Sequence, residues 1–356
     1  MRWSDRYKGL DYKRMALALG LGVLGGSVFT LLGTPMPWML GPLFACLLAS
    51  LFSVPLESPV SFRAPMTAMI GVMMGAGYSP ALFGQIGSWW ATILGLVVFM
   101  AVAGAACVTY FRFVAGYDFK TAYFCGMPGG LVEMVMLGDQ SGADMRKVAL
   151  IHAARIVFTV FSIPFVVQWL EGGDIATGTI DSVSLMEMDP GAFGWLAFTL
   201  VGGLLLGRYV KMPARYLMGP LIVSVFVHIT GLSNFKAPWE LVVIAQLVLG
   251  TTIGCRFAGS RTREILGILL ISVGSTIILL SLSIGAALIV SNLTQYSLTE
   301  LLLAYSPGGL AEMGLLALAL HLEVALVSTH HILRIFFVVF GASTLMPLFG
   351  IAKRKV

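Results

Sequence analysis

Apolar runs of about 20 residues recur along the chain and alternate with short polar stretches. A helix of about 20 apolar residues crosses the roughly 30 Å hydrocarbon core of a bilayer. The pattern therefore predicts an all-α polytopic membrane protein. Each half of the chain contains six such segments, which are 15–33, 38–54, 65–78, 88–111, 121–138 and 147–170, followed by 192–207, 216–231, 238–255, 265–290, 300–319 and 324–348.

The composition agrees with this pattern. Of the 356 residues, 58% are hydrophobic and 11% are charged, whereas a soluble domain carries roughly 25% charged residues. The net charge of +5 comes from short basic clusters between apolar runs, which orient a membrane protein and do not indicate a nucleic-acid partner. The four cysteines show no pairing or ligand spacing, so we expect neither a disulfide framework nor a metal or other cofactor.

The second half of the chain repeats the first. The motif PGGLVEM at 128–134 returns as PGGLAEM at 307–313. When residues 128–158 are aligned with 307–337, twelve of the 31 positions are identical. Internal duplication of this kind is typical of repeat-built membrane transporters.

The duplication extends upstream of the motif. The matched positions are GPL at 41–43 with GPL at 219–221, Gly71 with Gly250, and Gly75 with Gly254. Glycines at this spacing allow close packing of helices in a membrane. The predicted organisation is a first membrane repeat at 1–170, an acidic periplasmic linker at 171–190 and a second membrane repeat at 191–356.

The charges of the connecting segments indicate whether the Pro-Gly-Gly segment crosses the membrane. If it enters and returns, each half crosses five times, and only Lys236 among the 22 lysines and arginines lies outside, with Arg155 and Arg334 inside spans. The linker 171–190, which has five acidic residues and no basic one, then also lies outside. This distribution obeys the positive-inside rule.

Five crossings is an odd number, so the second half enters the membrane in the opposite sense. The sequence thus predicts two inverted repeats, each with about five transmembrane helices and one re-entrant or broken Pro-Gly-Gly helix. Both termini are expected in the cytoplasm.

The two Pro-Gly-Gly breaks are expected near the bilayer midplane, because a half-helix of about nine residues descends about 13 Å. The helix that restarts after each break points its unpaired N–H groups and positive dipole end there. Arg155 and Arg334 reach a similar depth from opposite sides, and a charge at that depth needs an interior partner. Arginine suits a carboxylate, so we expect a central site for a small organic anion.

The expected substrate-binding residues are Gly129, Gly130, Glu133, His152 and Arg155 in the first half, and Gly308, Gly309, Glu312, His331 and Arg334 in the second. In this hypothesis the arginines and the glycine N–H groups hold the anion. The glutamates and histidines carry protons or organise a coupling cation.

A purely structural alternative explains the same residues. Glu133 and Arg155, and likewise Glu312 and Arg334, would form two fixed ion pairs that hold the broken helices. A further pair, Asp144 and Glu323, precedes the last span of each half. These two acids are candidates for gating or ion relay, and the alternative is that they cap helices at the membrane interface.

Histidines cluster near the second motif, at positions 321, 330 and 331. His330 and His331 are adjacent and so point to different faces of a helix. The first repeat keeps only His152. We therefore expect no metal site there.

The sequence combines the paired PGGLxEM motifs, the His-x-x-Arg that follows each of them, the GPL turns and the GxxxG segments. Over nearly the whole chain this pattern resembles the AbrB-duplication family of bacterial inner-membrane proteins. The resemblance implies an inner-membrane location and a tandem fold. Members of that family have been labelled ammonia monooxygenases or regulators. A copper oxygenase needs a clustered ligand set and a transcription regulator needs a soluble DNA-binding element, and we find neither in the sequence.

The leading hypothesis is a secondary transporter of a small organic anion, expected to be a carboxylate, that works by alternating access and is coupled to an ion or a proton. It is not expected to be an enzyme. One alternative is a membrane-embedded sensor or regulatory protein that binds such a ligand without transporting it, and another is a metal-dependent membrane oxidoreductase. The expected partners are the lipid bilayer, the anion and a coupling cation or proton. The sequence leaves open whether the chain forms a homodimer.

Overall fold

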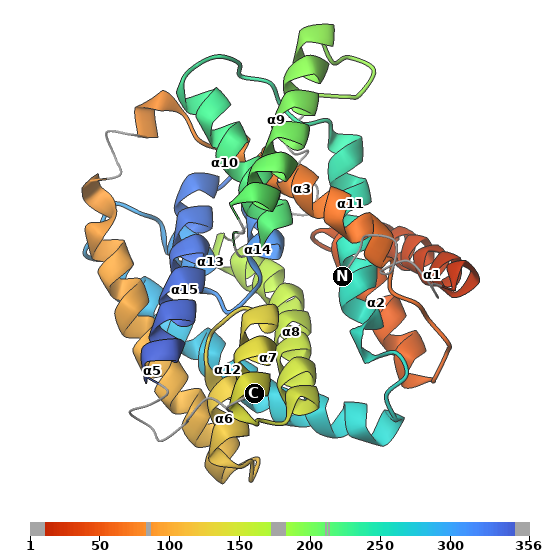
Figure 1. Ribbon diagram of the computed structural model, residues 1–356, viewed down its shortest axis with the longest axis vertical. Coiled ribbons are helices and arrows are strands. Elements are labelled where there is room, and N and C mark those ends of the chain that lie inside the picture. Colours follow the sequence, from red (N-terminus) through yellow and green to blue (C-terminus); the bar gives the residue numbers. More distant parts are fainter. Residues whose placement is uncertain (1–10, 83–86, 172–182, 211, 213, 346–356) are drawn as a thin grey trace. The chain divides into compact units, whose positions relative to one another are not determined.

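The computed structural model describes residues 11–82, 87–171, 183–210, 212 and 214–345. This part of the chain contains fourteen α-helices and no strand, which confirms the all-α prediction (Figure 1). The helices are α1 (Tyr12–Leu31), α2 (Pro37–Leu51), α3 (Val60–Ala76), α5 (Trp90–Phe113), α6 (Phe119–Gly126), α7 (Leu131–Ser141), α8 (Met145–Glu171), α9 (Pro190–Tyr209), α10 (Arg215–Ile229), α11 (Trp239–Gly254), α12 (Thr262–Ser291), α13 (Leu298–Tyr305), α14 (Leu310–Ala319) and α15 (Val324–Leu345), with 3-10 turns η2 (Pro80–Leu82), η3 (Gly87–Trp89) and η4 (Cys255–Phe257).

Seven helices in the described residues are long and apolar enough to cross a membrane. They are α1, α5, α8, α9, α11, α12 and α15. The sequence predicts ten crossings, and the other three helices, α2, α3 and α10, have 15, 17 and 15 residues. Helices of that length cover about 22–26 Å, less than a bilayer core. The chain is a polytopic membrane protein, while the count of ten crossings and the inversion of the second half stay predictions.

Both Pro-Gly-Gly segments are broken helices, as the sequence predicts. α6 ends at Gly126 and α7 begins at Leu131. In the second half α13 ends at Tyr305 and α14 begins at Leu310. Proline lacks the N–H that would continue the first helix, and Gly130 takes the extended conformation of a helix N-cap.

The first half-helix of each broken pair has eight residues. The N–H groups of its first turn have no acceptor within the helix and need partners elsewhere. The carboxylate of Asp118 accepts hydrogen bonds from the N–H groups of Lys120 and Thr121 at the start of α6. At the start of α13, Ser297 and Glu300 form a reciprocal capping box. The two caps use different residue types at equivalent positions and fix where both broken helices begin.

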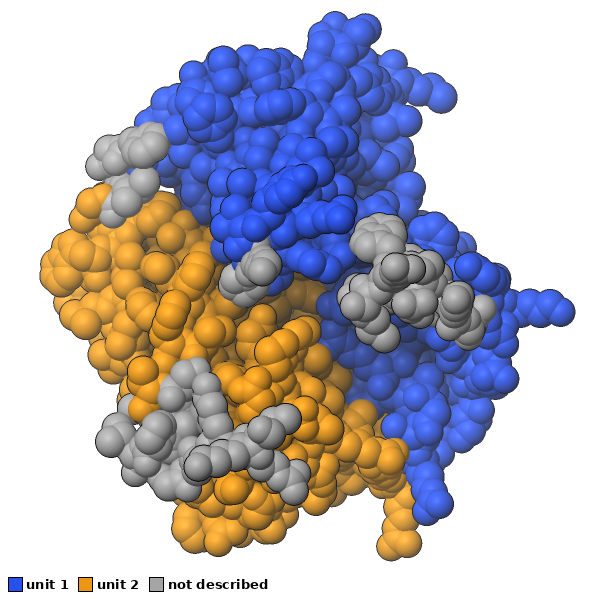
Figure 2. Space-filling view, in the orientation of Figure 1, with its two compact units in different colours: residues 1–84, 172–262, 314–325 blue, residues 85–171, 263–313, 326–356 orange. Residues whose placement is uncertain are grey.

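The chain forms two compact units, and each takes corresponding segments from both halves (Figure 2). Unit 1 comprises residues 1–84, 172–262 and 314–325, and unit 2 comprises residues 85–171, 263–313 and 326–356. Unit 1 therefore holds α1 to α3 with their copies α9 to α11. Unit 2 holds α5 to α8 with α12, α13, the first turn of α14 and most of α15. The linker residues Asp174 and Asp181 lie outside the described residues.

Matched glycine contacts hold unit 1 together. A Cβ added to Gly71 in α3 would lie 2.4 Å from the carbonyl oxygen of Leu217 in α10, and one added to Gly250 in α11 would lie 2.3 Å from that of Met39 in α2. These are equivalent contacts, since each joins the third segment of one half to the second segment of the other. Backbones that approach this closely are typical of glycine-mediated helix packing in membranes.

In unit 2 the broken helices pack against longer ones. α6 contacts α5 and α8, α7 contacts α8, and α13 contacts α5 and α8. α8 and α15, the last spans of the two halves, carry the two arginines of the predicted site. The side chains that the sequence places at a site, apart from Glu323, therefore belong to this one unit.

Candidate functional site

Arg155, in the middle of α8, is buried and points at the break between α6 and α7. Its Nη1 donates to the carbonyl oxygen of Met127 at 3.2 Å, and its Nη2 donates to that of Gly129 at 2.9 Å. These two carbonyls flank Pro128, where the helical hydrogen bonds stop. The guanidinium thus donates to two backbone carbonyls at a break where the regular helical hydrogen bonds are missing.

Arg334, in α15, has the same role in the second half. Its Nη1 donates to the carbonyl oxygen of Ser306 and its Nη2 to that of Gly308. Met127 and Ser306, and Gly129 and Gly308, are equivalent positions of the duplication. Arg334 is also buried. The two halves therefore share the same contacts. In each half one arginine of the last span donates to two carbonyl groups at the break of the preceding helix.

The paired histidines are fixed by hydrogen bonds. His152 Nε2 lies 2.8 Å from the carbonyl oxygen of Phe124, and His331 Nε2 lies 2.9 Å from that of Leu303. A carbonyl only accepts, so each Nε2 carries a proton. Nδ1 of His152 lies 2.7 Å from Nη2 of Arg155, which only donates. His152 is therefore neutral in this arrangement, and its ring orients both the arginine and the end of α6.

The second glycine of each motif leaves room for the glutamate three residues later. A Cβ on Gly130 would lie 2.1 Å from Oε2 of Glu133, and one on Gly309 would lie 2.0 Å from Oε2 of Glu312. Each glutamate therefore folds back over the second glycine, at the N-terminus of its own half-helix. A carboxylate is favourable at that end of a helix.

The first glycine of each motif is packed in the same way against the methionine of that motif. A Cβ on Gly129 would lie 3.0 Å from Met134, and one on Gly308 would lie 2.7 Å from Met313. The N–H of Gly129 donates to the carbonyl oxygen of Met127 at 2.8 Å. That N–H, which the sequence analysis assigns to an anion, is thus already used within the chain.

The ion pairs of the structural alternative are not formed. Within the described residues, ion pairs join Arg14 to Asp11, Arg146 to Glu264 and Lys147 to Asp144, and none involves Arg155 or Arg334. Glu312, which is 7% exposed, interacts electrostatically with Arg334 without closing to an ion pair. Glu133 is half-buried.

The two arginines are both buried in the same compact unit. The Nε atoms of both side chains are buried and have no hydrogen-bond partner among the described residues, and neither does Nδ1 of His331. Unit 2 thus holds two like charges with unused donors, an arrangement that is costly in an apolar interior unless an anion joins it.

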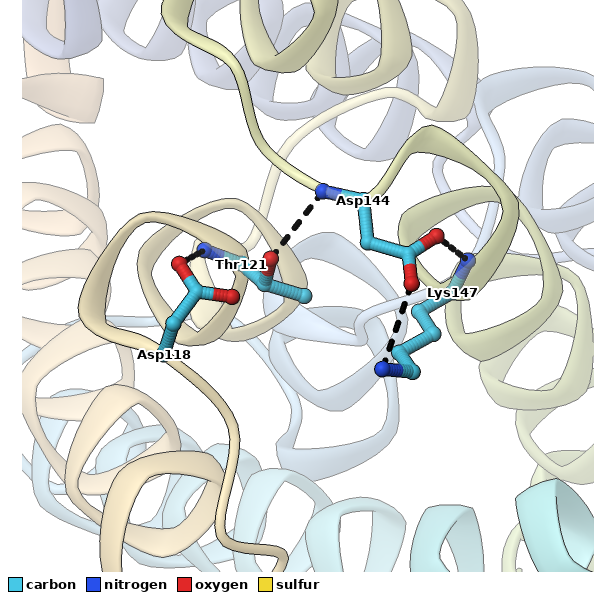
Figure 3. A network of polar contacts seen from close by, with 4 residues as sticks. All are labelled: Asp118, Thr121, Asp144 and Lys147. Carbon is cyan, nitrogen blue, oxygen red and sulfur yellow. Dashed lines mark hydrogen bonds and ion pairs between the residues drawn. The ribbon is translucent and has the colours of Figure 1, made fainter.

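Asp144 directly precedes α8 and lies beside Thr121 in the first turn of α6 (Figure 3). Its Oδ1 accepts from the N–H of Lys147 at 3.1 Å, its Oδ2 pairs with Nζ of Lys147 at 3.2 Å, and its own N–H donates to Oγ1 of Thr121 at 3.0 Å. Partial burial alone would raise the pKa of Asp144, but the hydrogen bonds and charge of Lys147 lower it below the ordinary value. This geometry fits the capping alternative. Glu323, its counterpart, lies in unit 1 beside the start of α15.

The structure thus brings the predicted binding residues together in two equivalent sets, each made of two glycines, a glutamate, an arginine and a histidine. Each histidine contacts a carbonyl group of α6 or α13, and His152 also contacts Arg155 directly. These carbonyl acceptors in α6 and α13 were not predicted from the sequence. The duplicated spacing is the one sequence feature that marks these contacts. In both halves the residue that supplies the carbonyl, Phe124 or Leu303, lies 28 positions before the histidine.

Comparison with known proteins places this arrangement in a family. A protein of Bacillus subtilis (strain 168) named "Uncharacterized protein YhjN" is 26% identical over 344 residues, covering 90% of this chain and 89% of the relative. A protein of Escherichia coli (strain K12) named "Putative regulator AbrB" is 21% identical over 322 residues, covering 90% of each chain. The family model described as transition state regulatory protein AbrB matches residues 38–350, which include both Pro-Gly-Gly breaks and both arginines. The chain therefore belongs to the AbrB family.

Proposed function

We propose that this protein is a secondary transporter of a small organic anion, with a carboxylate as the expected substrate, and that Arg155 and Arg334 bind the anion. The observation that carries the proposal is the pair of buried guanidinium groups in one unit that have no carboxylate partner within ion-pair distance in the described residues. A bound anion would neutralise both charges. It would also accept from the two unused Nε–H groups.

The way the arginines are held connects binding to movement. Each one already donates to two carbonyl groups at a helix break. An anion that accepts from the same guanidinium competes with those carbonyls for its N–H groups. Binding would therefore loosen or re-aim the broken helix, which is the kind of element that carries substrates through membrane transporters.

The glutamates define what the anion must displace. The carboxylates of Glu133 and Glu312 lie over the second glycine, at the half-helix N-termini where a substrate carboxylate would also be stabilised. A substrate carboxylate and a glutamate carboxylate cannot share that position without repulsion. The glutamate must then move away, so Glu133 and Glu312 are assigned to the conformational change that accompanies anion binding.

The direct test uses the purified protein and a panel of acetate, lactate, succinate and citrate. We expect at least one of these anions to raise the midpoint of thermal unfolding and the same anion, radiolabelled, to be taken up by proteoliposomes in a saturable way. Stabilisation without uptake under imposed proton or sodium gradients would contradict transport. No stabilisation by any member of the panel would contradict the carboxylate site.

Alternating access between inverted halves requires the linker 171–190 to lie on the opposite side from both termini, with the protein in the bacterial inner membrane and its termini in the cytoplasm. We expect single cysteines placed in the linker, in a variant without the four native cysteines, to react with an impermeant thiol reagent in intact cells. All four native cysteines are buried, which favours their replacement by small apolar residues. Labelling only after lysis would mean that the halves are parallel and would remove the basis for a site approached from both sides.

A second candidate is favoured by the names in the family. The Escherichia coli relative is called a regulator, and so is the protein that the family model describes. In this reading the same two arginines bind an anion and the broken helices change conformation without carrying it across. The proteoliposome experiment separates the two candidates, because a regulator binds the anion and gives no uptake.

A further inference from the structure

A buried polar cluster in unit 2 lies beside the second break and has no counterpart in the first half. His330 in α15, Thr92 in α5 and Tyr305 in α13 are all fully buried. Their equivalents by the 179-residue offset are Ile151, Ile271 and Gly126, none of which can hydrogen-bond through a side chain. A titratable histidine therefore lies beside the second break with no equivalent beside the first.

The hydrogen bonds of His330 are complete in both protonation states. Nδ1 lies 2.8 Å from the carbonyl oxygen of Leu326, so it carries a proton in either state. Nε2 lies 3.0 Å from Oγ1 of Thr92, and that hydroxyl also lies 2.8 Å from the carbonyl oxygen of Trp89. In the neutral ring Nε2 accepts from the hydroxyl. In the charged ring Nε2–H donates to Oγ1, and the hydroxyl turns to donate to Trp89.

This reversibility sets His330 apart from His152. His152 is held neutral because its Nδ1 accepts from Arg155. His330 gains or loses its second ring proton by a rotation of the Thr92 hydroxyl alone, and no buried donor or acceptor loses its last partner. A histidine with this freedom is suited to carry a proton.

The cluster is connected to the arginine site. The hydroxyl of Tyr305 donates to the carbonyl oxygen of Thr92 at 2.8 Å, and the next residue, Ser306, supplies a carbonyl to Arg334. Arg334 also follows His330 by four positions, one turn along the same face of α15. Among the described residues, the titratable and charged groups near His330 are His331 and Arg334 on α15 and Tyr305 on α13, whose ring meets the imidazole edge-on. η3 and α5 face it with Trp89 and Thr92, which do not ionise.

We infer that His330 binds the proton that accompanies the anion, so that the coupling ion is a proton held beside the second broken helix. The inference rests on the proposed anion site. A charged His330 adds a third positive charge to a buried region that already holds two guanidinium groups, which is unfavourable in the empty protein. A bound anion removes that penalty, so anion and proton each strengthen the binding of the other. The substrate is then carried as an anion together with one proton.

The test measures proton uptake when the anion binds to the full-length protein in detergent. Calorimetric titrations with the member of the acetate, lactate, succinate and citrate panel that binds, in two buffers with different ionisation enthalpies, give the number of protons taken up. We expect up to about one proton per anion for the wild type near the pH where His330 is neutral in the empty protein. His330→Ile, which copies the residue of the first half, should bind the anion with no such uptake.

Two further variants keep the result interpretable. His330→Gln retains a hydrogen-bonding side chain without a titratable proton, and it should behave as His330→Ile does even if the isoleucine variant fails to fold. Tyr305→Phe removes only the hydroxyl that donates to the Thr92 carbonyl and should keep the proton uptake of the wild type. Unchanged uptake in a folded His330 variant overturns this inference and leaves the anion site standing. If the wild type binds no anion of the panel, the proposed function fails and this inference fails with it.

Discussion

Replacement of either buried arginine by glutamine should weaken anion binding far more than it weakens the fold. Loss of one charged partner of a desolvated pair costs about 2–5 kcal/mol of binding free energy, which is roughly a 30- to 4,000-fold loss of affinity. Arg155→Gln and Arg334→Gln each remove a buried positive charge that lacks an ion-pair partner, and that removal offsets the loss of two hydrogen bonds to backbone carbonyls. The measurement is anion binding by calorimetry, with size-exclusion profiles to confirm folded protein.

Lysine variants at the same positions separate charge from geometry. Arg155→Lys and Arg334→Lys keep the positive charge, but one ammonium group cannot reproduce the fork that reaches two carbonyl oxygens. We expect them to bind the anion more weakly than the wild type and more strongly than the glutamine variants. If the arginines serve only to clamp the helix breaks, the lysine and glutamine variants should lose stability alike, and any anion affinity should be unaffected in those that fold.

The double variant tests whether both arginines hold one anion. If Arg155 and Arg334 share a ligand, the combined loss in Arg155→Gln/Arg334→Gln is smaller than the sum of the two single losses, because the first change already removes most of the binding. Two independent sites would give an additive loss. Additivity would therefore contradict a single central site while leaving each arginine as an anion ligand.

The sequence predicts the breaks and the buried charges because both are local features. Proline at 128 and 307 cannot continue a helix, and Arg155 and Arg334 stand alone within apolar runs, so their burial follows from the pattern of neighbours. The equivalence of the two halves is also visible in the sequence. The sequence does not show which segments pack together, and the structure reveals that each compact unit combines segments of both halves.

The direction in which each side chain points could not be predicted. A buried arginine needs a partner, and the sequence offers Glu133 and Glu312 as readily as a substrate. The structure gives the nearest acceptors as backbone carbonyls of the break, a class of partner that every residue has and that no pattern distinguishes. The contact between His330 and Thr92 could not be predicted for a related reason, since the two residues lie 238 positions apart in the sequence.

Replacement of Gly71 or Gly250, the two glycines where helices of unit 1 cross, by alanine should strongly destabilise the protein. In Gly71→Ala the new Cβ would lie 2.4 Å from the carbonyl oxygen of Leu217, and in Gly250→Ala it would lie 2.3 Å from that of Met39. Both obstacles are backbone atoms of a neighbouring helix, so relief requires two helices to separate. Overpacking of this kind costs about 1–3 kcal/mol, and sometimes more. The expected result is a lower midpoint of thermal unfolding for each variant, measured at one heating rate because unfolding of such a protein is often irreversible.

Gly309→Ala is the matched control, since the same methyl group is added at an equally crowded position. There the obstacle, 2.0 Å away, is Oε2 of Glu312, the end of a flexible side chain that can rotate aside, so the loss of stability should be small. Because the contacts of Gly71 and Gly250 are equivalent and involve different helices, their costs should be similar and should add in the double variant. A large loss in Gly309→Ala would mean that the glutamate is held rigidly over the glycine, which would contradict its assignment as a group that moves when the anion binds.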